Sequence, residues 1–231
     1  MKGLRTRCVG MFLALTALGA CSAAPRPAEE ALKNIKKPDV IYVPTPQEVV
    51  EMMLHLARVK PGDVVYDLGC GDGRVVVTVA KRYGCKAVGY DIDPDRVRES
   101  RQNVRENGIE RLARIEQKDI FTLDLSGADV IFLYLLPELN ARLIPQLEKL
   151  KPGARVVSHD FNMRGVRPDA VVSVWSRGDS SSHRIYLWNM PFMRVQTTEV
   201  SEVAEDDPWD EWEEDWDEDK DEGAGDSFPD S

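Results

Sequence analysis

The fold is decided by the stretch Val64-Val65-Tyr66-Asp67-Leu68-Gly69-Cys70-Gly71-Asp72-Gly73-Arg74. An apolar run ends in an aspartate, three alternate glycines follow, and a second apolar run from Val75 to Lys81 continues without turn residues. This pattern predicts a buried strand, a tight turn and the start of a helix. Glycines at such a turn allow positive φ and let a ligand approach the backbone closely. The free N–H groups of the helix N-terminus favour a polar or anionic group there.

The glycine spacing argues against a dinucleotide fingerprint. A G-x-G-x-x-G motif starting at Gly69 would place its third glycine on Arg74, whereas the chain has Asp67-x-Gly69-x-Gly71-x-Gly73. This spacing resembles motif I of the seven-strand (class I) S-adenosylmethionine-dependent methyltransferases. The resemblance implies an α/β fold with a doubly wound, mostly parallel, seven-stranded Rossmann-like sheet. It also implies S-adenosyl-L-methionine as cofactor, bound by Asp67, Gly69, Gly71 and Gly73.

A second acid follows the next predicted strand, Lys86 to Tyr90. Asp91 lies 24 residues after Asp67, close to the distance at which a strand-terminal acid meets a ribose. A carboxylate suits that role because it can accept two hydrogen bonds from vicinal hydroxyls. The alternative is that Asp91 or Asp93 caps the helix that begins at Pro94. We assign Asp91 to the ribose and Asp93 to the cap.

The third and fourth strands, predicted over Leu112 to Glu116 and Ala128 to Leu133, are followed by Asp119 and Tyr134. The resemblance implies that Asp119 accepts a hydrogen bond from the adenine amine. It also implies that Tyr134 lines the methyl-transfer channel and is the candidate catalytic residue, although an aromatic that merely closes the sheet is the alternative. Acids after three successive strands would meet at one sheet edge, where such sheets bind ligands.

The segment Tyr42-Val43-Pro44-Thr45-Pro46-Gln47-Glu48 precedes these strands. Thr45 is predicted to cap a helix that has Pro46 at its first position and Glu48 reaching back, which is a capping box. The resemblance adds that such a segment folds over the methionine end of the cofactor. Tyr42 and Thr45 are therefore candidate cofactor-binding residues, with a plain helix start as the alternative.

The remaining chemistry-bearing residues receive no catalytic role. A fifth strand is predicted to end at His159, which is either a base near the acceptor or a structural histidine, so we name no general base. The runs Ala170 to Trp175 and His183 to Trp188 predict a closing antiparallel C-terminal hairpin. Cys70 is interpreted as a small turn residue, and the cysteines show no disulfide framework or metal-ligand spacing.

The N-terminal residues 1–21 have the features of a secretory signal peptide. A basic head precedes a short apolar run that ends in Leu18-Gly19-Ala20-Cys21, which resembles the bacterial lipobox. This resemblance implies lipidation of Cys21 and a lipoprotein anchored to a membrane of the cell envelope, facing the periplasm, with Ser22 permitting sorting to the outer membrane. An uncleaved apolar N-terminus on a cytoplasmic protein is the alternative. Residues 22–37 are predicted to be a tether.

The C-terminal residues 199–231 form an acidic segment with 17 acidic residues and one lysine. Such a segment repels itself and cannot bury enough surface to fold alone, so a disordered tail is predicted. The alternative is a helix whose tryptophans dock on a partner. The negative charge of the segment would attract a basic partner. The tail carries a net charge of −16 and the rest of the chain +6, so the acidity of the whole chain, −10, comes from the tail. Residues 38–198 are expected to form the folded domain.

Several motifs together suggest the acceptor: Tyr-Val-Pro-Thr-Pro, Asp-Leu-Gly-Cys-Gly-Asp-Gly-Arg, Tyr-Leu-Leu-Pro-Glu-Leu-Asn and Val-Val-Ser-His-Asp-Phe. They look most like a bacterial branch similar to the mitochondrial seven-strand protein-lysine methyltransferases, which implies N-methylation of a lysine in a protein substrate. The Asn-Pro-Pro-Tyr signature of nucleobase and glutamine methylation and the basic-aromatic interleaving of a nucleic-acid groove are both missing, so no nucleic-acid partner is expected. Because S-adenosylmethionine is not expected outside the cytoplasm, a lipid-anchored, non-catalytic scaffold with a methyltransferase fold is the alternative function.

Overall fold

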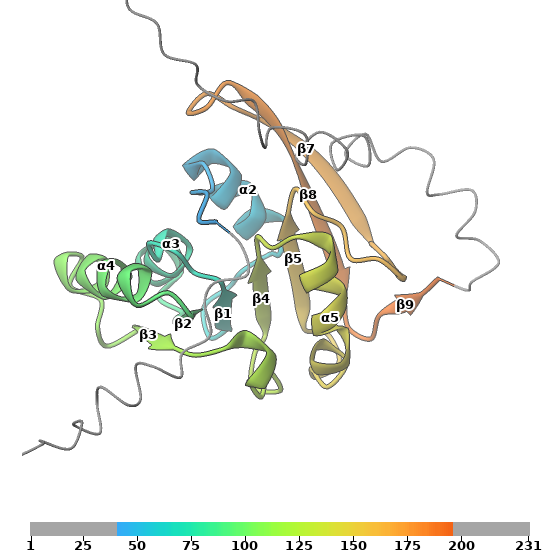
Figure 1. Ribbon diagram of the computed structural model, residues 1–231, viewed down its shortest axis with the longest axis horizontal. Helices are drawn as coiled ribbons and strands as arrows, with labels where there is room; N and C mark the ends of the chain where they lie inside the picture. The colour runs from blue at the N-terminus through green and yellow to red at the C-terminus, as the bar shows by residue number, and fades with distance from the viewer. Residues whose placement is uncertain (1–40, 196–231) are drawn as a thin grey trace, which may run out of the picture. The chain divides into compact units, whose positions relative to one another are not determined.

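The computed structural model describes residues 41–195, which form a central sheet with helices on both faces (Figure 1). The strands of this sheet are β1 (Val64–Leu68), β2 (Lys86–Asp91), β3 (Ala113–Gln117), β4 (Val130–Leu133), β5 (Arg155–His159), β7 (Ala170–Ser176) and β8 (Ser181–Asn189). The helices are α2 (Gln47–Leu56), α3 (Arg74–Tyr83), α4 (Pro94–Glu106), α5 (Pro137–Leu147) and the short 3₁₀ helix η1 (Ile120–Thr122).

The sheet has the strand order β3-β2-β1-β4-β5-β8-β7. Strands β1 to β5 pair in parallel, whereas β8 runs antiparallel to both β5 and β7. The predicted fold class, including the closing hairpin, is therefore confirmed. The order changes direction between β1 and β4, and in open α/β sheets the crevice at such a switch point binds ligands.

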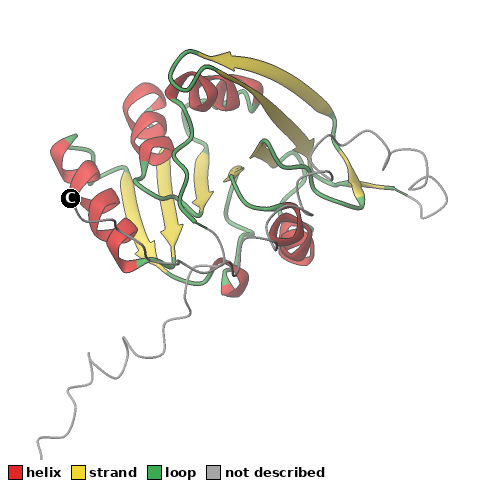
Figure 2. Ribbon diagram, turned by 45° about the horizontal axis from the view of Figure 1, so that its top comes forward, coloured by secondary structure: helices red, strands yellow, loops and turns green. Residues whose placement is uncertain are grey.

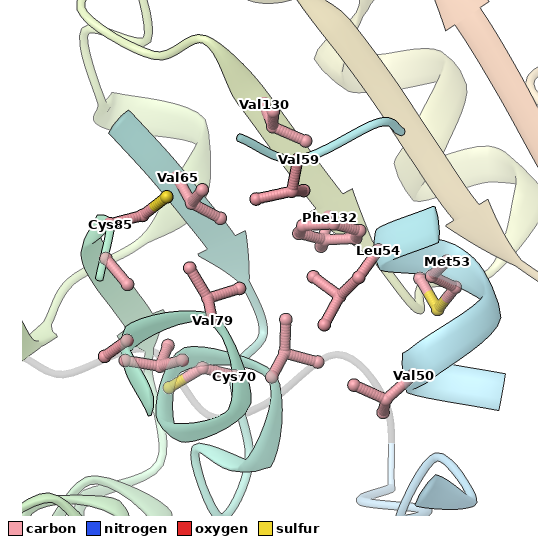
Figure 3. Close-up of a cluster of buried hydrophobic side chains, with 14 of the residues drawn as sticks. Val50, Met53, Leu54, Val59, Val65, Cys70, Val79, Cys85, Val130 and Phe132 are labelled. Carbon is pink, nitrogen blue, oxygen red and sulfur yellow. The ribbon is translucent and has the colours of Figure 1, made fainter. Parts of the chain in front are cut away.

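The strands alternate their side chains between two apolar layers, because neighbouring residues of a strand point to opposite faces. In β4, Val130 and Phe132 pack with α2, α3 and α4, whereas Ile131 and Leu133 pack with α5. Figure 3 shows the first of these layers, in which Leu54 of α2 and Phe132 point toward one another. Both faces of the parallel strands are thus covered, as parallel sheets require.

The β7–β8 hairpin forms one edge of the sheet, and its long strands stand out in Figure 2. A second, small sheet was not predicted from the sequence. It pairs β6 (Val166–Arg167) with β9 (Met193–Arg194) in antiparallel fashion. Its strands have two residues each, which is too short for an alternating pattern to reveal.

The helix ends confirm one of the predicted caps and contradict the other. The Asp93 carboxylate accepts the N–H of Asp95 at the start of α4. The capping box at α2 was wrong. Pro46 occupies the N-cap without a side-chain hydrogen bond, because the Thr45 hydroxyl pairs instead with Nδ1 of the buried His159, 3.1 Å away.

Several predictions lie outside the described residues. These are the signal peptide, the lipidation of Cys21, the tether over residues 22–37 and the acidic tail over residues 199–231. Between residues 41 and 195, no helix is long and apolar enough to cross a membrane.

Candidate active site

A cavity of about 540 Å³ opens at the carboxyl ends of β1, β2 and β4. Its wall is completed by η1 and by residues 41–45. The structure brings most of the predicted site residues together around it: Tyr42, Thr45, Asp67, Gly69, Asp91, Asp119 and Tyr134 all line the cavity. Gly71 and Gly73 are not part of its lining, but they build the turn beneath it.

The glycine turn is held in a conformation that residues with a side chain rarely adopt. Gly69, Gly71 and Gly73 have φ of 83°, 52° and 80°. A Cβ at Gly71 would overlap the ring of Tyr42, which lies directly over the turn. The backbone here is therefore closely covered, and only glycine leaves room for the Tyr42 ring.

Asp91 receives two backbone hydrogen bonds at the end of β2. Its Oδ2 accepts the N–H of Gly71 and its Oδ1 accepts the N–H of Asp93, both at 2.9 Å. Each carboxylate oxygen can accept more than one hydrogen bond, so both remain capable of binding a ligand hydroxyl. Burial raises the pKa of Asp91, although these backbone hydrogen bonds oppose that effect.

Asp67 lies at the base of the cavity and is almost completely buried. Burial raises the pKa of this carboxyl to about 8, and the negative charges of Asp91 and Asp72 contribute further. A positively charged ligand in the cavity would favour the ionised form of Asp67, because an opposite charge within a few ångströms offsets the lost hydration.

Asp119 caps the 3₁₀ helix η1 and at the same time reaches the cavity. Its Oδ1 accepts the N–H of Phe121 at 2.9 Å, and no other hydrogen bond to its carboxylate is found within residues 41–195. Ile120 and Phe121, which follow it, add apolar surface to the same wall. This corner can therefore pack against a flat apolar group and accept a hydrogen bond from its edge.

Residues 41–46, which we call the strap, cross the glycine turn and are fastened by Arg74. The Arg74 guanidinium forms a fork with the Asp72 carboxylate, with Nε–Oδ1 at 3.0 Å and Nη2–Oδ2 at 2.7 Å. Its Nη1 donates to the carbonyl of Thr45 at 2.6 Å. The guanidinium of Arg96 also lies 4.9 Å from the centre of the Tyr42 ring, within the range of a cation–π contact.

Sequence reasoning assigned no role to Arg74, Asp72 or Arg96. Arg74 and Asp72 lie inside the quoted glycine motif, so an ion pair two residues apart could have been proposed from the sequence. The bond from Arg74 to the Thr45 carbonyl joins residues 29 positions apart and has no local signal.

Tyr134 forms an aromatic wall on the far side of the cavity. Its ring centre lies 3.9 Å from that of His159 and 5.9 Å from that of Phe161. Burial, together with the charges of Asp160 and Asp179, raises the pKa of Tyr134 to about 12, so its hydroxyl keeps its proton at neutral pH. The neighbouring cavity wall is apolar, with Leu135, Leu136 and Leu139.

His159 is fully buried behind Tyr134 and does not line the cavity. Burial lowers its pKa to about 4, with the nearby His183 adding to this effect and the carboxylates opposing it, so the ring is neutral at physiological pH. Burial alone would lower the pKa of His183, but Asp160 and Asp179 outweigh it and raise that pKa. His159 therefore supports the cavity wall from behind.

Cys70 is buried in the glycine turn as a free cysteine. Burial, with the charges of Asp67 and Asp91, raises the pKa of its thiol well above the usual range. The thiolate needed for nucleophilic chemistry is thus disfavoured, in agreement with its interpretation as a turn residue.

Comparison with known proteins identifies one domain family and several relatives. Residues 67–170 match the ANTKMT methyltransferase domain. A protein-lysine N-methyltransferase of Saccharolobus islandicus is 46% identical over 153 residues, which cover 65% of this chain and 94% of that protein. An adenine nucleotide translocase lysine N-methyltransferase of Mus musculus is 35% identical over 135 residues, which cover 58% of each chain.

A solved structure is also similar in sequence and fold. It is described as an RNA methyltransferase from Salinibacter ruber in complex with S-adenosyl-L-homocysteine. Its sequence is 44% identical to this chain, the TM-score is 0.61, and the match covers 67% of this chain and 97% of that one.

Proposed function

This chain belongs to the family of S-adenosylmethionine-dependent methyltransferases that carry the ANTKMT methyltransferase domain, and we propose that it methylates the side-chain amine of a lysine in a protein. The observation that carries this proposal is the similarity to the Saccharolobus islandicus protein-lysine N-methyltransferase over 94% of that protein's length. The activated methyl group is supplied by S-adenosyl-L-methionine, in agreement with the similar fold that holds S-adenosyl-L-homocysteine.

The cavity suits this cofactor in size and in the chemistry of its wall. Its volume of about 540 Å³ lies within the range of small-molecule sites. We assign the ribose hydroxyls to Asp91, whose two oxygens still have free lone pairs, and the adenine amine to Asp119. Asp67 would balance the positive charge of the cofactor, and Tyr42 and Thr45 of the strap would cover its methionine end.

The reaction requires a neutral amine, because an ammonium group has no lone pair to attack with. The apolar wall formed by Leu135, Leu136 and Leu139 would exclude water from the lysine side chain, and loss of water lowers the pKa of an ammonium. Tyr134 keeps its proton, so its contribution would be to orient the amine rather than to remove a proton from it.

The atoms balance without another reactant. A bond forms between the amine nitrogen and the methyl carbon while the carbon–sulfur bond breaks, and the electron pair of that bond stays on sulfur. The one proton released overall goes to water when the ammonium becomes the neutral amine, before the attack, and the methylated amine carries the positive charge afterwards. Positioning of the two reacting groups is the main contribution expected from the protein.

An isotope-transfer assay tests the acceptor. The full-length chain is incubated with methyl-labelled cofactor and protein extract, and the labelled proteins are hydrolysed to amino acids. We expect the label in methyl-lysine.

Asp91→Ala should lower the affinity for the cofactor about 100-fold, because a charged hydrogen-bond acceptor is lost. Asp95→Ala, at an exposed position of the first turn of α4, is the matched control. Label in another amino acid would refute the lysine assignment.

RNA is the second candidate acceptor, favoured by the similar Salinibacter ruber protein. The described residues carry 22 lysine and arginine residues against 20 acidic ones, which is not the strongly basic balance typical of nucleic-acid binding. Total RNA in the same assay separates the two candidates. Label that ribonuclease releases would support RNA, and label that survives ribonuclease but not protease would support protein.

We also propose that the chain is anchored to a membrane of the cell envelope by a lipid on Cys21. The basic head, the apolar run and the lipobox-like Leu18-Gly19-Ala20-Cys21 support this proposal. Labelling cells with an alkyne fatty acid should mark the wild-type protein, and Cys21→Ser should abolish the label. An equal label in Cys21→Ser would point to lipidation at another site, and no label on the wild type would point to the cytoplasmic alternative.

Export would separate the domain from the cytoplasmic supply of cofactor. Calorimetric titration of the purified full-length chain with S-adenosyl-L-methionine addresses this conflict. Micromolar or tighter binding is expected if the exported domain works as an enzyme. Failure to bind would instead favour the scaffold alternative, in which the fold is kept without its reaction.

A further inference from the structure

Behind the wall of the cavity, three potential ligand atoms face one another. They are Nε2 of His159, Oδ2 of Asp160 and Nδ1 of His183, which come from the end of β5, the next residue and β8. The two ring nitrogens are 2.9 Å apart, and the Asp160 oxygen lies 2.9 Å from His183 and 3.2 Å from His159. Both histidines are buried, and Asp160 is half-buried.

Hydrogen bonds alone do not satisfy this triangle when Asp160 is ionised. If both facing nitrogens carry a proton, two donors meet at 2.9 Å. If only one of the two nitrogens carries a proton, the lone pair of the other faces the Asp160 carboxylate, at 3.2 Å from His159 or 2.9 Å from His183. Either arrangement sets like groups against each other at a buried position, which is costly. A single cation would be attracted by all three lone pairs at once.

The spacing of the three atoms matches the coordination shell of a metal ion. Bonds between zinc and imidazole nitrogen are about 2.0–2.1 Å long. Ligand atoms that lie at right angles at this distance are about 3.0 Å apart, and tetrahedral ones about 3.4 Å. The observed distances of 2.9, 2.9 and 3.2 Å therefore suit three neighbouring ligands of one ion.

The outer nitrogen of each ring also has a hydrogen-bond partner, which for His183 is a carboxylate, as is usual for metal ligands. Nε2 of His183 lies 2.9 Å from Oδ2 of Asp179, and Nδ1 of His159 lies 3.1 Å from the hydroxyl of Thr45. Such partners orient a ligating imidazole and hold its second nitrogen protonated. The Asp160 carboxylate is also held in place, because its Oδ1 accepts the N–H of Arg184 at 2.8 Å. The backbone of Asp160 has a φ of 56°, which residues other than glycine rarely adopt.

We propose that His159, Asp160 and His183 bind one divalent first-row transition-metal ion. Two imidazoles and one carboxylate suit zinc, iron, cobalt or nickel better than calcium or magnesium, which prefer oxygen ligands. Three protein ligands leave further coordination positions for water. The ion would hold the wall of Tyr134 and, through Thr45, the strap, because the His159 ring contacts both.

The chain offers a matched control because it has only three histidines. His55 is exposed on α2 and takes no part in the triangle. The full-length, tag-free protein is stripped with a chelator and titrated with Zn²⁺ by calorimetry. We expect one equivalent to bind to the wild type and to His55→Gln. The affinity for Zn²⁺ should fall by a factor of about 100 or more in His183→Gln and in Asp160→Asn. Equal binding by all four proteins, or no stoichiometric binding by the wild type, would overturn the proposal.

Two further measurements separate this site from weak binding elsewhere on the chain and from misfolding of a variant. Titrations with Ca²⁺ and Mg²⁺ report the weak binding expected of the acidic residues 199–231, which all four proteins share. Because a variant of His183 or Asp160 can fail to fold, the wild type labelled with ¹⁵N-histidine is also followed by NMR. One equivalent of Zn²⁺ should shift the ring signals of His159 and His183 and leave those of His55 in place. Unmoved His159 and His183 signals would refute the site without any variant.

Discussion

The folded chain buries the carboxyl group of Asp67, where its ionised form is unfavourable. Its pKa is raised to about 8, above the value of about 4 expected in the unfolded chain. The folded state therefore binds one more proton than the unfolded state between these values. By linkage, this group lowers the stability of the ligand-free protein as the pH rises from about 4 to about 8.

Asp67→Asn should remove this loss of stability, because an amide does not ionise. We expect the advantage of the variant over the wild type to be small near pH 4 and to grow by about 5 kcal/mol up to pH 8.5, because about four pKa units are involved. Urea denaturation of the ligand-free proteins at both pH values measures the difference. Asp95→Asn, at an exposed site, is the control, and an equal pH dependence in wild type and Asp67→Asn would contradict the prediction.

The same carboxyl should make cofactor binding depend on pH. S-adenosyl-L-methionine carries one more positive charge than S-adenosyl-L-homocysteine, so it gains more from an ionised Asp67. The preference for the charged ligand is expected to increase as the pH rises toward about 8. Calorimetry with both ligands from pH 6.5 to 8.5 tests this, and the trend should disappear in Asp67→Asn.

At the scale of elements, Arg74 of α3 is one of the side chains that fasten the strap. Arg74 connects Asp72 of the glycine turn to the Thr45 carbonyl, so it joins two walls of the cavity. The strap itself makes few other polar contacts in the described part of the chain, and Tyr42 is more than one third exposed.

Arg74→Gln should loosen the strap without unfolding the domain. The loss of charged hydrogen bonds is expected to raise the KM for the cofactor about tenfold, with a smaller effect on kcat. Arg82→Gln is the control, because it removes an exposed ion pair between the last turn of the same helix, α3, and Glu51 of α2. Steady-state kinetics with varied cofactor measures the effect, and equal KM values in the two variants would argue against a role for Arg74 in holding the strap.

At the scale of the whole domain, a buried ion pair connects distant parts of the chain. Asp63 precedes β1 and Arg155 begins β5, and their side chains meet at 2.8 Å while mostly buried. Arg155 keeps a buried Nε without a partner within the described residues. The pair therefore adds orientation between β1 and β5 at some cost in hydration.

The effects of removing the two partners of this pair, by Asp63→Asn and by Arg155→Met, should not be additive. Asp63→Asn leaves the guanidinium uncompensated, and we expect it to destabilise the domain by about 3 kcal/mol. The double variant Asp63→Asn with Arg155→Met should lose less than the sum of the two single variants. Urea denaturation gives the three values, and strict additivity would show that the two side chains do not act as a pair.

The acidic residues 199–231 lie outside the described part of the chain, and their charge makes its own prediction. A segment with 17 acidic residues should attract a basic protein substrate over long range. Deleting it is expected to raise the KM for such a substrate several-fold at low salt and to leave kcat unchanged. A full-length chain with these acids changed to Asn and Gln should behave like the deletion. If this neutral chain keeps the wild-type KM, charge is not the reason.

The sequence by itself determined the glycine turn, the order of the strands and helices of the main sheet, and the three acids that follow successive strands. These features depend on residues close together in the chain, where apolar periodicity, glycine and helix caps decide the conformation. The predicted capping role of the Thr45 hydroxyl was wrong because its true partner is distant in the sequence. Its hydroxyl could cap a local helix or pair with a distant histidine, and only the packed sheet brings His159 within reach.

Tertiary structure alone decided how the strap, the aromatic wall and the histidine triangle meet. Arg74 reaches Thr45 across 29 residues, and His159 meets His183 because β8 pairs antiparallel with β5. No local spacing predicts such contacts, since each requires the register between strands to be known. The local pattern therefore determined the fold and most of the residues that line the cavity, whereas the groups behind the cavity wall were positioned by strand pairing and burial.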